Sequence, residues 1–111
     1  MPLIKIQTSS EIPSEVMAKF SRAAAQIIGK PENYVMVSVS TAGMMMAGAE
    51  GQAAFVEVKS IGGLNRTVCQ ELTNKICELL ADHPGIPPER VYINFTEVPP
   101  DEWGWNNSLF G

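Results

Sequence analysis

Hydrophobic and polar residues alternate over four short stretches of this chain, the pattern of a β-strand that buries one face. The four stretches are Leu3–Thr8, Tyr34–Thr41, Gln52–Ser60 and Val91–Thr96. Each has the length of an ordinary strand. The sequence therefore predicts four strands.

Two longer stretches repeat apolar residues at the three- and four-residue spacing of an amphipathic helix. They run from about Pro13 to Ile28 and from Asn65 to Asp82. The apolar stripes consist of Val16, Phe20, Ala23, Ala24 and Ile27 in the first, and of Val68, Leu72, Ile76 and Leu79 in the second. Ser14 is the expected N-cap of the first helix, and Gly29 followed by Pro31 is expected to end it.

The order strand, helix, strand occurs twice, and the segments that join helix to strand match in kind. Gly29–Val37 and Gly85–Ile93 both run from a glycine through proline into an alternating strand. We expect an internal duplication of a β-α-β unit. Because each unit buries one sheet face under its helix, the predicted fold class is α/β, a four-stranded sheet with two helices on one face, formed by a single domain of residues 1–111.

The other face of the predicted sheet carries a mixed set of side chains. It holds Met36, Ser38, Glu57, Lys59, Tyr92 and Asn94. This set is too apolar for a free surface and too polar for a dry core, so we expect a closed homo-oligomer with its sheets turned inward around a wet channel. The tail from Val98 to Gly111 contains Trp103, Trp105 and Phe110, and we expect it to pack on a neighbouring subunit.

Composition and charge argue against two classes of binding partner, nucleic acids and membranes. The net charge is −4 and no Lys/Arg cluster occurs, which argues against a nucleic acid partner. No apolar stretch approaches the roughly 20 residues that span a bilayer, and the N-terminus lacks the pattern of a signal peptide, so no membrane partner is expected. We expect a cytoplasmic protein, or one secreted without a signal peptide.

Neither cysteine chemistry nor a metal is expected. Cys69 and Cys77 stand eight residues apart on one helix, about 12 Å at the standard rise, so they cannot pair with each other and are interpreted as buried, reduced thiols. Met44–Met46 is interpreted as adaptable packing because no other soft ligand lies nearby in sequence. We expect no metal site and no cofactor.

The dipeptide Met1-Pro2 suggests a candidate catalytic group. Aminopeptidase removal of a methionine that precedes the small residue proline would expose the secondary amine of Pro2. An α-amino group titrates near about 7.7–8.0, and burial or a nearby cation would lower its pKa toward neutrality, where a general base works best. Met-Pro also begins many strands with no chemical role, so the dipeptide alone leaves both interpretations open.

Five motifs in order carry a resemblance over essentially the whole chain. They are Met1-Pro2, Gly29-Lys30-Pro31, Ser60-Ile61-Gly62-Gly63, Arg90-Val91-Tyr92-Ile93-Asn94 and Gly104-Trp105-Asn106-Asn107-Ser108. In this order they resemble the macrophage migration inhibitory factor and D-dopachrome tautomerase family of the tautomerase superfamily. The resemblance implies a homotrimer with active sites at its subunit interfaces and a cofactor-independent keto–enol tautomerase acting on a small aromatic keto acid of the phenylpyruvate type.

The resemblance also implies a role for each site residue. Pro2 is matched to the catalytic base, Lys30 to the lysine that binds the substrate carboxylate, and Ile61 to the position whose backbone amide contacts the same carboxylate. Tyr92 and Asn94 are matched to residues that the adjacent subunit donates. Two purely structural interpretations stay open: Lys30 could complement a helix dipole, and Tyr92 with Asn94 could form a structural hydrogen-bond pair.

The chain departs from the vertebrate members of this family. Ala53-Ala54-Phe55-Val56 stands where some carry Cys-x-x-Cys, so thiol–disulfide activity is not expected. The charged pair linked to receptor binding has no counterpart, because the loop Thr41–Met44 has no acidic residue and no arginine follows the first strand. The alternatives are a secreted, cytokine-like protein that binds a host receptor with vestigial activity, and a related tautomerase acting on an unsaturated or halogenated acid.

Overall fold

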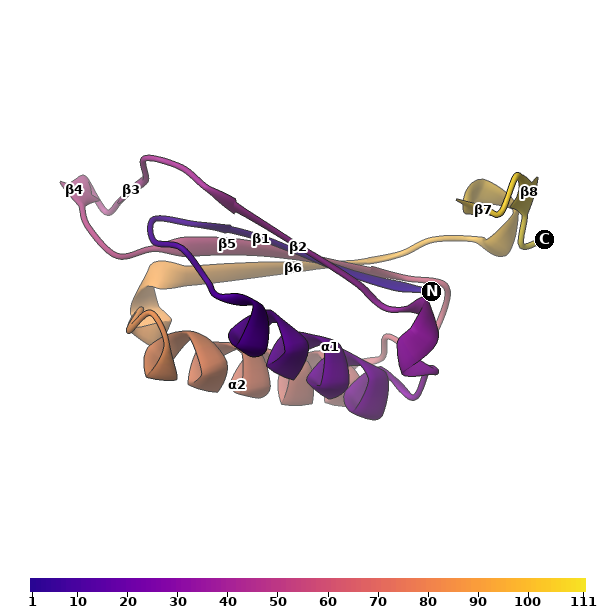
Figure 1. Ribbon diagram of the computed structural model, residues 1–111. Coiled ribbons are helices and arrows are strands. Elements are labelled where there is room, and N and C mark those ends of the chain that lie inside the picture. The colour runs from indigo at the N-terminus through magenta and orange to yellow at the C-terminus, as the bar shows by residue number, and fades with distance from the viewer.

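The computed structural model describes residues 1–111 as two layers, a four-stranded sheet and a pair of helices that lie side by side on one of its faces (Figure 1). The strands are β1 (Pro2–Thr8), β2 (Met36–Thr41), β5 (Ala54–Ser60) and β6 (Val91–Glu97), and the helices are α1 (Ser14–Ile28) and α2 (Arg66–Asp82). Neither helix combines the length and the apolar character that crossing a membrane requires.

Strand order confirms the predicted duplication. The sheet runs β2-β1-β5-β6, with β1 parallel to β2, β5 parallel to β6, and the two central strands antiparallel. Each parallel pair with its helix is one β-α-β unit, and the two units meet along β1 and β5. The predicted α/β fold with two helices on one face is confirmed.

The core lies between the sheet and the helices, and its side chains are those that the alternation predicted. The central strands bury Ile4, Ile6, Val56 and Val58 against Phe20, Leu72, Ile76 and Leu80 of the helices. Two positions differ: Ile27 and Val68 are only half-buried, whereas Ile28 and Leu80, which the predicted stripes did not include, are buried. Ile28 is the last residue of α1 and lies under the loop that follows β5, where its side chain comes close to Gly63.

The helix ends correct one prediction. Ser14 is not the N-cap of α1, because Pro13 occupies that position and its carbonyl accepts from the N–H groups of Val16 and Met17, both at 3.0 Å. No side chain caps this helix. Gly29 ends it as predicted, with φ 80° in the left-handed region that glycine adopts without strain.

Two strands begin later than predicted, because their first predicted residues take part in other local structure. Tyr34 belongs to a 3-10 helix, η1 (Glu32–Tyr34), and a matching 3-10 helix, η2 (Pro88–Arg90), precedes β6. Proline directly before or at the start of each 3-10 helix favours the turn. Gln52 precedes β5, and its side-chain oxygen accepts from the hydroxyls of Ser9 at 2.9 Å and Ser10 at 2.8 Å.

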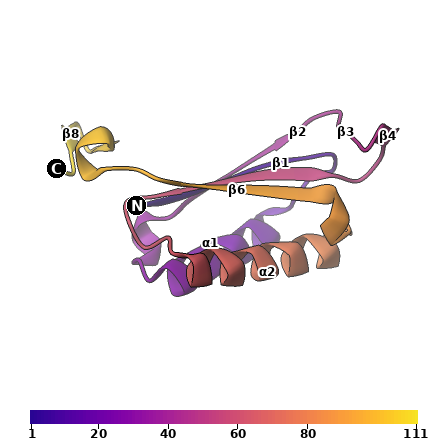
Figure 2. The same cartoon turned by 180° about the vertical axis from the view of Figure 1, so that it is seen from behind.

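Two small hairpins extend from opposite ends of the sheet (Figures 1 and 2). Strands β3 (Met45–Met46) and β4 (Ala49–Glu50) form one; after the 3-10 helix η3 (Pro100–Glu102), β7 (Gly104–Trp105) and β8 (Ser108–Leu109) form the other. Both turn through two residues with positive φ, the geometry of tight hairpin turns. The N-terminus lies at the end of the sheet from which β7 and β8 extend (Figure 1).

Candidate active site around Pro2

Pro2 begins β1, and its side chain is buried on the face of the sheet that the helices cover. Directly opposite on the antiparallel strand β5 stands Ser60. Met1 is present in the structure, so the nitrogen of Pro2 is an amide there. The pKa of the Met1 amine is lowered from its ordinary value, first by burial and second by the positive charge of Lys30. The end of β1 therefore disfavours a second positive charge.

Lys30 follows the left-handed Gly29, and its backbone N–H still donates to the carbonyl of Ala25 at 3.1 Å. Its side chain passes close to Gly63 in the loop after β5. A Cβ at Gly63 would lie 3.0 Å from Ile28 Cγ2 and 3.5 Å from Lys30 Cε. The loop thus packs on the end of α1, and the missing side chain of Gly63 leaves room for the stem of Lys30.

Ile61 is the first residue of that same loop and is half-buried. The loop is held on its other side by β6, because the N–H of Leu64 donates to Glu97 Oε1 at 3.0 Å. Glu97 is the register partner of Ser60, which is in turn the partner of Pro2. The structure therefore brings Pro2, Lys30 and Ile61 to one end of the sheet.

Ser60 is exceptional among the buried polar residues of this chain. Its exposed fraction is 0%, and its Oγ is the only buried side-chain polar atom without a hydrogen-bond partner. Buried hydroxyls are nearly always paired, because an unpaired one loses its hydrogen bonds to water. In the sequence Ser60 stood only as the first letter of a motif, and no local pattern indicated that its hydroxyl would be unpaired.

Tyr92 and Asn94 do not join this group within one chain. By sheet register Tyr92 lies opposite Phe55 and Asn94 opposite Glu57, both toward the far end of β5 from Ser60. At roughly 3.3 Å per residue, these positions lie about 17 Å and about 10 Å along the strand from the level of Pro2. Their side chains are exposed on the sheet face turned away from the helices, whereas Pro2 points to the helices.

Aromatic residues gather beside the candidate site. Trp105 of the C-terminal hairpin meets Tyr34 edge-to-face at a centroid distance of 5.6 Å and stacks on Phe110 at 5.7 Å. Part of the tail therefore packs on its own chain, which the sequence did not indicate. Trp105 and Phe110 still expose 51% and 40% of their surface, so the cluster has an uncovered side.

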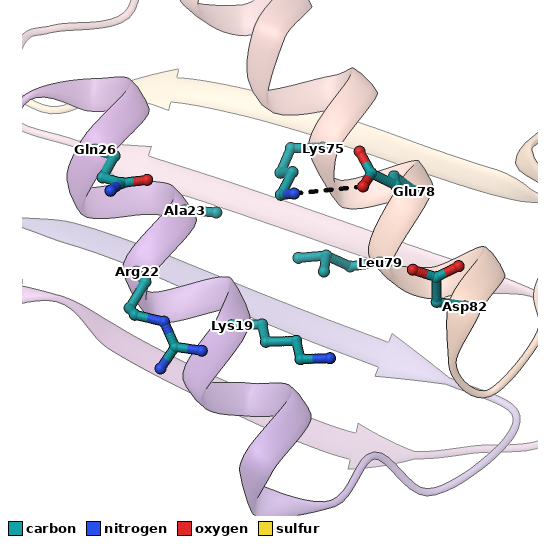
Figure 3. A pocket seen from close by; sticks show the side chains of 8 residues that line it. All are labelled: Lys19, Arg22, Ala23, Gln26, Lys75, Glu78, Leu79 and Asp82. Carbon is teal, nitrogen blue, oxygen red and sulfur yellow. Dashed lines mark hydrogen bonds and ion pairs between the residues drawn. The ribbon is translucent and has the colours of Figure 1, made fainter.

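The groove between the two helices is a separate feature (Figure 3). It has a volume of about 400 Å³ and is lined by Lys19, Arg22, Ala23, Gln26, Lys75, Glu78, Leu79 and Asp82. Its charged groups include one ion pair, Lys75 with Glu78 at 3.4 Å within α2. None of the candidate residues lines it, and both signs of charge are mixed along it, so no ligand class is favoured there.

The cysteines are half-buried rather than fully buried as expected, and neither is paired. Burial raises the pKa of both thiols, and the carboxylate of Glu97 raises that of Cys69 further. A raised pKa keeps a thiol protonated at neutral pH and lowers its reactivity. No group of three or more His, Cys, Asp or Glu side chains is arranged to hold a metal ion.

Comparison with known proteins shows the family to which this chain belongs. A family model described as macrophage migration inhibitory factor matches residues 1–111. The chain belongs to this family. Among curated relatives, the macrophage migration inhibitory factor homolog of Brugia malayi is 35% identical over 115 aligned residues, which cover all of both chains.

Solved structures of family members have the same fold along nearly the whole chain. The homologue from Prochlorococcus marinus superposes with a TM-score of 0.93 at 39% identity, covering 98% of this chain and 99% of that one. The macrophage migration inhibitory factor-like protein of Entamoeba histolytica gives a TM-score of 0.92 at 31% identity, with 98% of each chain covered. Membership of the family therefore rests on both sequence and fold.

Proposed function

We propose that this chain, once Met1 has been removed, is a keto–enol tautomerase of the phenylpyruvate type that uses the Pro2 amine as its general base. The observation that carries the proposal is the place of Pro2, at the buried end of β1 and beside the cation Lys30. A base of this kind removes a proton from the carbon next to the keto group, and a proton is added to the keto oxygen. No electrons are transferred, and no metal or organic cofactor is required.

The electrostatics of this end of the sheet suit a neutral amine. Burial and Lys30 already lower the pKa of the amine of Met1, one residue farther out. Both causes act in the same direction on an amine at Pro2, whose ring is buried. A pKa lowered from about 8 toward neutrality leaves a large fraction of the amine unprotonated at pH 7.

Substrate binding is assigned to the groups that surround Pro2. Lys30 supplies the positive charge for a substrate carboxylate, and the backbone N–H of Ile61 supplies a hydrogen-bond donor in the adjoining loop. Gly63 and Glu97 hold that loop between α1 and β6. The exposed aromatic cluster at the same end offers a surface for an aromatic ring.

A homotrimer completes the proposed site. Tyr92 and Asn94 lie too far from Pro2 in their own chain to contact the same substrate, so a neighbouring chain must supply them if they act there. The open sheet face supports such an assembly, because Met36 and Tyr92 are 64% and 66% exposed in the single chain. Cyclic closure of three copies would cover this face.

Ketonisation of phenylpyruvate, followed by ultraviolet absorbance, tests the proposed activity. Intact mass first establishes that Met1 is absent from the purified protein. We expect Pro2→Gly to lower kcat/KM by about 10² to 10⁴, the usual contribution of a general base. A chain expressed with methionine aminopeptidase inhibited keeps its Pro2 nitrogen as an amide and should lose activity to the same extent. Equal rates in all three proteins would contradict the assignment of Pro2.

A further inference from the structure

The loop that follows β5 is anchored at both of its ends on the same two residues of β6. At its start, the carbonyl of Ser60 accepts from the backbone N–H of Val98 at 2.9 Å. At its end, the N–H of Leu64 donates to Glu97 Oε1 at 3.0 Å. The first anchor is a backbone bond that continues the ladder of the sheet, whereas the second depends on a single side chain.

Between these anchors the loop has no hydrogen bonds of its own. The N–H groups of Ile61, Gly62 and Gly63 donate to no other group of the chain. Both glycines have positive φ, 68° and 79°, and glycine has the greatest backbone freedom of all residues. The N–H of Ile61 is therefore free to bind another molecule, but its position depends on how firmly the two ends of the loop are held.

The carboxylate of Glu97 also lies beside the start of α2. Leu64 directly precedes Asn65, the N-cap of this helix, and no acidic residue stands in its first turn. The pKa of the Cys69 thiol, one turn farther on, is raised first by burial and second by the charge of Glu97. Negative charge is favourable at this end of a helix, and a hydrogen bond to an ionised acceptor is roughly twice as strong as a neutral one. Glu97 is thus a strong anchor for the loop.

We propose that Glu97 is a positioning residue, which holds Leu64 on β6 and thereby keeps the backbone N–H of Ile61 where the substrate carboxylate binds. The proposal rests on the proposed function, which assigns that N–H to the substrate. Without the bond to Glu97, the end of the loop is released and its two glycines allow Ile61 to turn away. Because Gly63 packs beside the stem of Lys30, the same movement disturbs the second group assigned to the carboxylate.

Simple electrostatics predicts the opposite effect of substituting Glu97. The residue is an anion at the same end of the sheet as a site for an anionic substrate. Removal of its charge alone would strengthen substrate binding and lower KM. A positioning role predicts instead that KM rises when the hydrogen bond is lost. The two explanations therefore differ in the sign of the change.

Three variants of the processed chain separate the charge from the hydrogen bond. Glu97→Ala removes both, whereas Glu97→Gln removes the charge and keeps an oxygen that can accept from Leu64. Glu78→Ala is the matched control, because it removes an exposed carboxylate that pairs with Lys75 within α2. We expect Glu97→Ala to raise KM for phenylpyruvate about tenfold with kcat within about twofold of wild type. Glu97→Gln should stay within about threefold of the wild-type KM, and Glu78→Ala should not change it.

Amide hydrogen exchange tests the anchor without relying on catalysis. The N–H of Leu64 should exchange at least about tenfold faster in Glu97→Ala than in wild type, and at an intermediate rate in Glu97→Gln. The N–H of Ala53 is the internal control, because it also donates to a side chain, Ser9 Oγ at 3.1 Å, at the other end of β5. Its exchange should be the same in all the proteins.

Three results would overturn the proposal. A lower KM in both Glu97 variants would mean that Glu97 acts only by repelling the substrate. An equal rise in KM in both would mean that its charge matters and its bond to Leu64 does not. Unchanged exchange of Leu64 in Glu97→Ala would mean that the carboxylate does not hold the loop. If wild type has no tautomerase activity, the proposed function fails by itself, and the exchange of Leu64 still decides whether Glu97 orders the loop.

Discussion

The two ends of the central strand β1 are built from similar elements but differ in whether their polar groups have hydrogen-bond partners. At the Thr8 end the polar groups are paired. Arg90 alone donates to three carbonyls, those of Gln52 at 2.6 Å, Met46 at 3.1 Å and Ala49 at 2.9 Å. At the Pro2 end the structure places a hydroxyl without a partner and an amine whose pKa is lowered.

This difference suggests a structural role for the Thr8 end of β1 and a functional role for the Pro2 end. Paired polar groups hold the β3–β4 hairpin in place at one end and leave little chemistry available there. Unpaired groups at the other end cost stability, and such costs are typical of functional positions. We expect substitutions at the Thr8 end to change stability, and substitutions at the Pro2 end to change activity.

Replacing the scaffold arginine should have the largest effect. Arg90→Ala leaves three carbonyls without their donors, and we expect a loss of about 3 kcal/mol in unfolding free energy, measured by urea denaturation. The kcat per folded molecule should not change. Arg22→Ala is the control, because Arg22 is exposed on α1 and should change stability by less than about 0.5 kcal/mol. If the Arg90 variant unfolds with the free energy of wild type, the paired polar groups at the Thr8 end do not have the stabilising role assigned to them.

Removing the charge of Lys30 should be next in size. Lys30→Gln should raise KM for phenylpyruvate about 10- to 100-fold, because a charge-assisted hydrogen bond to the substrate carboxylate is lost. Unfolding free energy should change little. Lys19→Gln removes an equivalent charge from the groove between the helices and should leave KM unchanged. If both variants behave alike, overall charge rather than a local contact attracts the substrate.

The two loop glycines offer a matched pair. Gly62 and Gly63 both have positive φ, 68° and 79°, so alanine strains the backbone by a similar amount at either position. Only at Gly63 would the new Cβ also meet Ile28 and the stem of Lys30. We expect Gly63→Ala to cost about 1 kcal/mol more than Gly62→Ala and to raise KM further. Equal effects of the two substitutions would mean that the contact with Lys30 does not matter.

The smallest expected effect is a pH dependence of the chain that retains Met1. The pKa of its amine is lowered on folding, so the unfolded chain binds more protons between the folded pKa and about 8. The amine's contribution to stability is therefore present above about pH 8 and lost as pH falls through the folded pKa. Urea midpoints should fall between about pH 8 and 6 by more than in the same chain with Met1 acetylated. Parallel profiles would mean that folding does not perturb the amine.

Much of the fold was predictable because it depends on local periodicity. Alternation along Leu3–Thr8 and helical spacing along Asn65–Asp82 predicted elements that the structure confirms within a residue or two. Ser14 was wrong as a cap because Pro13 takes that position, a choice made by backbone geometry at the helix start. Tyr34 was wrong as a strand residue because a 3-10 turn precedes β2.

The candidate site was predictable only in part. Motif order pointed to Pro2, Lys30 and Ile61, and the structure brings these three to one end of the sheet. Tyr92 and Asn94 remain predictions, because they lie elsewhere in the single chain. Gly63 could have been suspected from the adjacent pair Gly62-Gly63, since paired glycines often mark a tight loop.

By itself, the sequence determined the elements, the duplicated order and the motifs that place the chain in its family, because each depends on residues a few positions apart. Tertiary structure alone decided which polar groups found partners. Arg90 donates hydrogen bonds to carbonyls some forty residues away in sequence, and the Ser9 hydroxyl donates to Gln52 at a similar separation. The hydroxyl of Ser60 has no hydrogen-bond partner. A hydrogen bond requires two atoms at close range and in line, and only the folded chain determines which distant groups meet.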